Sequence, residues 1–249
     1  MRRALLSALA MGLLVGVAGR SAAQDDAKEI IRKAIAAHGG ADKLDKFKAS
    51  RSSGKGTISI MGMDLEFTAD TVSQLPDKQK TTVKLEIMGN AATIVQLVNG
   101  DKLSLTVNGM AAPIQDAQKD GLKQALALQK VMLLTPLLSD NSYEIKAIPG
   151  VKVGDKETVG VEVKGKDLKD CKLYFDKATN LIARVDHKGP DPTGINEVTQ
   201  QVVLSDYKDV QGVKKPMKTV MTHDNQKFME QTVTKMELSE KIDEKEFSD

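Results

Sequence analysis

Alternation of apolar and polar residues, with a period of two, extends over two long parts of this chain. It runs from about residue 50 to 112 and again from 143 to 239, and Val83, Leu85 and Ile87, separated by charged residues, show it clearly. Successive side chains of a β-strand point to opposite faces of a sheet, so the pattern predicts strands with one buried and one wet face. About ten to twelve such segments are present, and together they predict a large antiparallel sheet.

Turn residues separate the alternating segments. Asn99-Gly100 and Asn108-Gly109 each lie between two such segments, and Gly89-Asn90 marks a third boundary. Asn-Gly is a strong hairpin signal, because both central positions of the favoured turn need a positive φ. Residues 50–112 are therefore predicted to form a meander of about five strands, and residues 143–239 a second strand set.

The N-terminal part of the chain carries a helical period instead. Residues 25–48 contain an apolar stripe through Ile31 and Ile35, and Gly39 and Gly40 interrupt it. Glycine readily supplies the left-handed cap that ends a helix. An N-terminal helical region is therefore predicted over 25–48.

A second helical segment, residues 116–138, is unusually apolar and is broken at Pro136. Exposed by itself it would be insoluble, so it must cover the sheet or a ligand. Two interpretations stay open. The segment is either a helix that covers the core of an α+β domain, or a lid whose apolar face alternates between sheet and ligand, with Pro136 as a hinge.

Residues 1–23 have the pattern of a secretory signal peptide. Arg2 and Arg3 precede an apolar run, and small residues lead up to a cleavage position near Ala23. The full chain has 36 basic and 34 acidic residues. Loss of Arg2, Arg3 and Arg20 leaves 33 basic and 34 acidic residues, a net charge of −1. We therefore expect an exported, periplasmic or similar location and a single domain over 24–249.

Composition excludes several classes of function. The nearly neutral mature chain lacks the basic surface that nucleic-acid binding needs, and with no Trp, three Tyr and five Phe it has little to stack on bases or sugars. No segment after the leader reaches the roughly 18 apolar residues that a bilayer-spanning helix needs. The lone cysteine, Cys171, cannot form an internal disulfide, and its strand pattern indicates burial. We expect a monomer without an integral membrane span.

No pattern of catalytic or metal-binding residues is present. His38, His187 and His223 are far apart in the chain, and their spacing does not support a metal site. The metalloprotease, nucleophile-elbow and phosphate-loop motifs are absent. We therefore expect no catalytic residues, no metal and no cofactor, and an enzyme ranks below the two non-catalytic functions given at the end of this section.

Methionines are frequent near the last strands, at Met217, Met221, Met229 and Met236. An unbranched, polarisable side chain suits an adaptable apolar surface, although ordinary core filling is the commoner role.

The sequence resembles the LolA/LolB-like superfamily of lipoprotein carriers. The likeness rests on a secreted chain with an N-terminal helix, a long meander and one apolar helical insertion. It also rests on four local motifs: the helix-ending glycines at 36–44, the hairpins at 173–181 and 207–216, and the chain end at 242–247. Asn180 and Gly212 supply left-handed turn positions in these hairpins.

The resemblance implies a strongly curved antiparallel half-barrel with helices covering its concave face. It also implies a cavity for acyl chains between the sheet and a helical lid, without covalent chemistry. The function it implies is the binding or carriage of lipid, lipoprotein acyl chains or another apolar ligand in the bacterial envelope. In members of this fold an arginine of the sheet holds the lid, and Arg51, near the first strand, is the candidate here.

Nine apolar residues are the candidates for the cavity lining: Leu85, Ile87, Val95, Leu97, Leu103, Leu105, Leu126, Val131 and Leu134. A register shift of one residue in any strand would exchange its inward and outward sets. The alternative function is an envelope protein–protein interaction module with a filled core and no small ligand, in which a partner docks on an edge strand.

Overall fold

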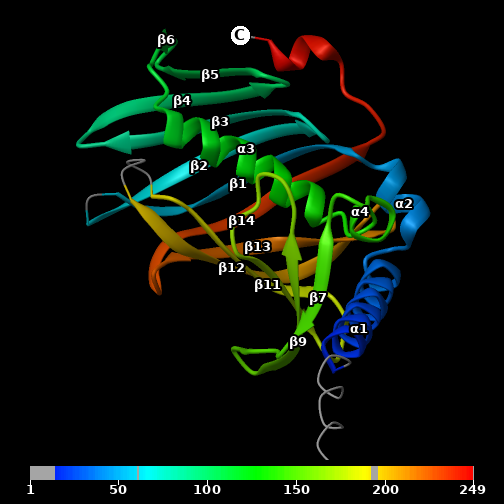
Figure 1. The fold of residues 1–249 in the computed structure, drawn as a ribbon. Helices are drawn as coiled ribbons and strands as arrows, with labels where there is room; N and C mark the ends of the chain where they lie inside the picture. The colour runs from blue at the N-terminus through cyan, green and yellow to red at the C-terminus, as the bar shows by residue number, and fades with distance from the viewer. Residues whose placement is uncertain (1–14, 61, 192–195, 249) are drawn as a thin grey trace, which may run out of the picture.

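The fold is that of a computed structural model, which describes residues 15–60, 62–191 and 196–248. Short turns connect the helices and strands along the chain (Figure 1). The helices are α1 (Val15–Ala37), α2 (Ala41–Lys46), α3 (Asp116–Val131), α4 (Pro136–Ser139) and the C-terminal 3₁₀ helix η1 (Glu244–Phe247). The first strands are β1 (Ala49–Ile60), β2 (Met63–Gln74), β3 (Lys78–Ile87), β4 (Asn90–Asn99), β5 (Lys102–Val107) and β6 (Met110–Ala111). The later strands are β7 (Glu144–Ile148), β8 (Lys152–Val153), β9 (Lys156–Lys164), β10 (Cys171–Asp176), β11 (Ile182–Pro190), β12 (Glu197–Val210), β13 (Val213–His223) and β14 (Gln226–Ser239).

The strands form one curved antiparallel sheet. Its order is β6-β5-β4-β3-β2-β1-β14-β13-β12-β11-β10-β9-β7, and β8 pairs with β9. The predicted α+β class, with a curved open sheet and helices on its concave face, is confirmed. The sheet has 14 strands rather than ten to twelve, because β6 and β8 have only two residues each and are too short to show alternation.

The helices at the N-terminus differ from the prediction in their bounds. α1 begins at Val15, upstream of the predicted start at residue 25 and of the predicted cleavage position at Ala23. Residues 1–14 of the predicted leader lie outside the described residues. Gly39, with a φ of 122°, separates α1 from α2, and a Cβ on it would lie 2.3 Å from the carbonyl oxygen of Gly212. No helix in the described ranges has the length and apolar character needed to cross a bilayer.

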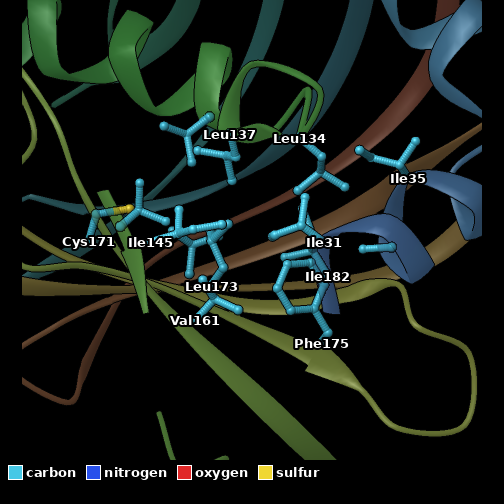
Figure 2. Packing of buried hydrophobic residues seen from close by; sticks show 14 of the residues in the cluster. Ile31, Ile35, Leu134, Leu137, Ile145, Val161, Cys171, Leu173, Phe175 and Ile182 are labelled. Atoms are coloured by element: carbon cyan, nitrogen blue, oxygen red, sulfur yellow. The ribbon is translucent and has the colours of Figure 1, made fainter. Parts of the chain in front are cut away.

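The main hydrophobic core fills the C-terminal half of the concave side. Ile31 and Ile35 of α1 pack with Leu134 and Leu137, which follow α3, and with the inward residues of β7 and β9–β11 (Figure 2). Phe175 of β10 belongs to this core, with 1% of its surface exposed. Cys171 also belongs to this core, and burial raises the pKa of its thiol to about 12, so the predicted burial of this cysteine is confirmed.

The pairing of β1 with β14 joins the two halves of the sheet. Its register shifts between Ser53 and Gly54, which marks a bulge, and bulges increase local bend and twist. Gly56 follows on the same face, and a Cβ on Gly56 would lie 2.0 Å from the backbone oxygen of Glu230. The two glycines therefore let the backbone of β14 approach β1 closely beside the bulge.

The C-terminal segment packs on the outer, convex face. Ile242 and Phe247 form a small cluster with Ala49 and Leu97, whose side chains point away from the face that α1 and α3 cover. Lys78 Nζ also pairs with the carboxylate of Glu244 at 2.6 Å. The end of the chain therefore ties β1, β3 and β4 together from outside.

Turn chemistry agrees with the sequence at one predicted hairpin and differs at another. Asn108 and Gly109 both have positive φ, of 52° and 79°, as the Asn-Gly signal requires. At the predicted Gly89-Asn90 turn, the positive pair is Met88 and Gly89 instead. Asn90 becomes the first residue of β4 and donates its side-chain amide to Met88 O at 3.2 Å.

We expect Gly56→Ala to lower the free energy of unfolding by about 1–3 kcal/mol, because the new Cβ would overlap the backbone of β14. Ser52→Ala places the same residue in the same strand without that overlap and is the matched control. Urea unfolding followed by circular dichroism measures both variants. Equal stability of the two would show that close backbone approach at Gly56 does not limit the fold.

His38 makes stability depend on pH. Burial lowers the pKa of this imidazole from 6.5 to about 4, against the opposing effect of its 2.7 Å hydrogen bond to Ala34 O. Between these values the unfolded chain binds a proton that the folded chain excludes, so stability is full above pH 6.5 and is lost as pH falls toward 4. We expect His38 to contribute a loss of roughly 2–3 kcal/mol in that window.

Denaturant unfolding at pH 7.5 and pH 4.5 checks this expectation. The difference between the two pH values should be smaller in His38→Gln than in the unmodified chain, since the other two histidines are common to both. An unchanged difference would contradict it.

Candidate ligand-binding cavity

α3 lies across the concave face of the sheet, in front of β1–β3 (Figure 1). Its N-terminus is closed by a capping box, in which the backbone N–H of Gln115 donates to Gln118 Oε1 at 3.0 Å. Leu122, Ala125 and Leu128 recur at helical spacing on one side of α3. The sequence thus places an apolar stripe on the side of the helix that faces a hollow.

A cavity of about 390 Å³ lies between this stripe and the sheet. The volume is in the usual range for small-molecule sites. Its walls come from α3 and its flanks, from β4 and β5, and from β11–β13 with the residue that follows β11. The lining residues are Gln96, Leu105, Ile114, Gln118, Gly121, Leu122, Gln124, Ala125, Leu128, Met132, His187, Pro190, Asp191, Gln200, Val202 and Met221.

An apolar floor continues from the cavity along the sheet. Phe67, Ala69 and Leu85 are buried at its centre, and partly buried side chains surround them: Ile58, Leu65, Val83, Ile87, Ala92, Ile94 and Met229. Met229 of β14 lies directly opposite Met221 of β13, which lines the cavity. Cavity and floor therefore form one apolar surface that is only partly covered.

Polar side chains lie next to the apolar wall formed by β11–β13. His187, Gln200 and His223 are direct cross-strand neighbours, one row away from Val185, Val202 and Met221. His223 stacks on Phe228 with ring centroids 4.0 Å apart. Its Nε2 is buried, with no hydrogen-bond partner among the described residues. Burial lowers the pKa of both His187 and His223, so both imidazoles are mainly uncharged at neutral pH.

Side-chain amides attach α3 to the sheet. Gln129 Nε2 donates to Gln79 Oε1 of β3 at 2.7 Å, and the amide of Gln124 donates to the carbonyl of Lys188 in β11. Just beyond the helix, Thr135 Oγ1 donates to Asp45 Oδ1 at 2.7 Å. A net hydrogen bond contributes only about 0.5–1.5 kcal/mol, so these ties position α3 without fixing it strongly.

The structure brings some of the predicted lining residues together and separates others. Leu105 lines the cavity, and Leu85 and Ile87 belong to the floor. Leu103 lies on the same face, two residues from Leu105 in β5. Of the three helical candidates, Val131 and Leu134 pack in the main core, and Leu126 is buried on α3.

Val95 and Leu97 lie on the other face of the sheet. Gln96 lines the cavity, and its two neighbours in β4 therefore point outward. Leu97, 1% exposed, packs under the C-terminal segment with Phe247. Both faces of β4 carry apolar residues there, so alternation in the sequence did not reveal the inward face.

Arg51 does not hold α3. It lies on the convex face, and its Nη2 donates to Glu246 Oε1 of the C-terminal helix at 3.0 Å. The physical reason is its position in β1, where the cavity-side residues are Ser50, Ser52 and Gly54. α3 is held instead by the glutamine amides described above and by Leu128 and Val131, which pack in the main core.

Several lining residues were not among the sequence candidates. Leu122, Leu128 and Met132 belong to the segment identified as apolar, but helical spacing alone did not show which side faced the hollow. Val202 and Met221 come from strands far along the chain. The only sequence signal for them was the run of methionines in the last strands, of which Met221 and Met229 contact the cavity or its floor.

The described residues contain no group of three or more side chains suited to holding a metal ion. What the cavity offers is apolar surface, four glutamine amides, the side chain of His187 and the carboxylate of Asp191. This arrangement can bury an apolar chain and form hydrogen bonds.

No family model matches the sequence, and comparison with curated proteins found no match. Among solved structures, a domain named for outer-membrane lipoprotein sorting, from Vibrio parahaemolyticus, is similar over 90% of this chain and 97% of that one, with 13% identity and a TM-score of 0.56. A LolA superfamily protein from Nitrosomonas europaea is similar over 90% and 97%, with 11% identity and a TM-score of 0.56.

A DUF1329 family protein from Desulfovibrio piger is similar over 89% of this chain and 97% of that one, with 12% identity and a TM-score of 0.54. At such identities the likeness concerns the fold. The curved sheet and the helix across its concave face, together with these matches, show that the chain has the LolA-like fold.

Proposed function

We propose that this chain is an exported carrier for lipid, lipoprotein acyl chains or another apolar ligand, held non-covalently between the curved sheet and α3. The observation that carries the proposal is the cavity of about 390 Å³ and its continuation onto a partly covered apolar floor. A core that served only packing would be filled on both halves of the sheet, as the main core is.

Burial of an acyl chain supplies the binding energy in this proposal. Each methylene removed from water contributes about 0.8 kcal/mol, so a chain of moderate length binds without any charged contact. Met221 and Met229 adapt to chains of different shape, since methionine has flexible and polarisable side-chain atoms.

α3 acts as the lid. Its cavity side includes the half-buried Leu122 and the exposed Ala125, so part of its apolar surface lacks a packing partner in the sheet. The Gln129–Gln79 hydrogen bond takes the role of the latch. A neutral latch is weak enough to open when a ligand enters or leaves.

Export, domain organisation and oligomeric state belong to the same proposal. Residues 1–23 act as the signal peptide, the mature chain begins at Gln24, and residues 24–249 act as one monomeric domain in the periplasm or a similar compartment. The matched structures named for LolA and for lipoprotein sorting support an envelope role.

Two separate substitutions, one on each face of the sheet, test which face binds the ligand. The full chain is expressed in a bacterial host and the exported form is examined by native mass spectrometry beside an organic extraction. We expect the measured protein mass to match a chain that begins at Gln24. The extract should contain an acyl-chain species in near-stoichiometric amount. Leu105→Gln removes apolar surface from the cavity and should weaken retention of that species about tenfold, since burying a leucine contributes roughly 1.5–3 kcal/mol.

Val95→Gln is the matched control, because Val95 is in the neighbouring strand and points to the other face. It should leave ligand retention unchanged. A clean ligand-free mass with no uptake of added fatty acid or lipopeptide would reject the carrier. It would favour the alternative, an envelope interaction module that binds its partner without a small ligand.

A further inference from the structure

The cavity contains almost no charge. The chain has 36 Lys and Arg residues, and none of those in the described ranges lines it. Asp191, whose carboxylate accepts a hydrogen bond from Asn196 Nδ2 at 3.0 Å, is the one charged side chain among the described lining residues, and it is acidic. An anionic group that entered the cavity would therefore find no cation to pair with.

Glutamine amides provide the polar part of the lining from two directions. Gln118 and Gln124 project from α3, Gln200 lies in β12, and Gln96 lies beside Leu105 across the hollow. Gln200 Nε2 donates to Pro190 O at 3.0 Å, so its amide orientation is set by the backbone. A glutamine amide both donates and accepts hydrogen bonds, and it carries no charge.

The two histidines next to the cavity add to this neutral character. His187 lines the cavity, and His223 lies two strands away with a buried Nε2 that has no partner among the described residues. Burial lowers the pKa of each imidazole. Neither histidine therefore supplies a cation at or above neutral pH.

We infer that the cavity selects an acyl chain whose head group is uncharged and rich in ester, amide or hydroxyl groups, in preference to a free fatty acid. This inference rests on the proposed function and names its ligand class. Uncharged carbonyl and hydroxyl groups of a ligand can form hydrogen bonds with the glutamine amides, which both donate and accept them. A carboxylate would lose its hydration beside Asp191 without gaining an ion pair, and unpaired burial of a charge is strongly unfavourable.

Three ligands with the same twelve-carbon chain test the inference on the full protein after delipidation. They are 1-monolauroylglycerol, N-lauroylethanolamine and laurate, at pH 8 and below their micelle concentrations. Isothermal titration calorimetry should show at least one neutral ligand binding about tenfold or more tighter than laurate, the difference expected from one unpaired buried group. One neutral ligand carries an ester and the other an amide, so comparison of their affinities shows which of these groups the cavity prefers.

The experiment distinguishes failure of the head-group inference from failure of the carrier proposal. Laurate that binds as tightly as both neutral ligands, or more tightly, overturns the head-group inference and leaves the carrier proposal standing. Absence of binding by all three ligands overturns the carrier proposal together with the inference.

A variant with an added positive charge tests whether the uncharged lining of the cavity causes the head-group selectivity. Gln96→Lys places a cation beside the cavity and should raise the affinity for laurate about tenfold while changing that for monolauroylglycerol less than about threefold. Gln201→Lys is the control, because Gln201 is next to Gln200 in β12 and points to the opposite face. Equal responses of the two variants would overturn the assignment of the cavity's neutral lining as the selecting feature.

Discussion

The first strand of the sheet, β1, pairs with the last, β14, along ten residues, and through this pairing both halves of the chain share one surface. Gly54 and Gly56 lie at and next to the register shift, and a Cβ on either would come within 3.0 Å of the backbone of β14. A larger side chain there would push the strands apart. The concave face, the cavity and the position of α3 all depend on this curvature, because a flatter sheet would leave α3 without opposing walls.

Helices cover the two halves of the concave face unequally. Over the C-terminal half, α1 and the segment after α3 pack against β7 and β9–β11 and fill the space. Over the N-terminal half, α3 is the one described helix that crosses the sheet, and the floor around Phe67 and Leu85 is only partly covered. A filled core and an incompletely filled hollow therefore lie side by side on the concave face.

The outer face contributes stability away from the cavity. Phe247 and Ile242 pack on Leu97, and Arg51 and Lys78 form ion pairs with Glu246 and Glu244. The exposed pairs contribute little each, so burial of the two apolar side chains is the larger effect. Because these contacts lie on the convex face, the concave face is free of them, and its neutral glutamines and apolar residues can serve recognition.

The sequence by itself determined the class of fold and most of the helices and strands, though not their exact bounds or the two shortest strands. Period-two alternation, Asn108-Gly109 and the broad apolar stripe of residues 116–138 are local signals, and local sterics and hydrogen bonding give them meaning without knowledge of distant residues. The same signals could not show which face of β4 points inward, because Val95 and Leu97 are as apolar as an inward row would be. Only the tertiary structure decided that Leu97 lies under Phe247, that Arg51 pairs with Glu246, and that Leu105 meets Val202 and Met221 across one hollow. The physical reason is that sheet curvature and strand register bring together residues far apart in the chain. No local sequence pattern specifies these long-range contacts.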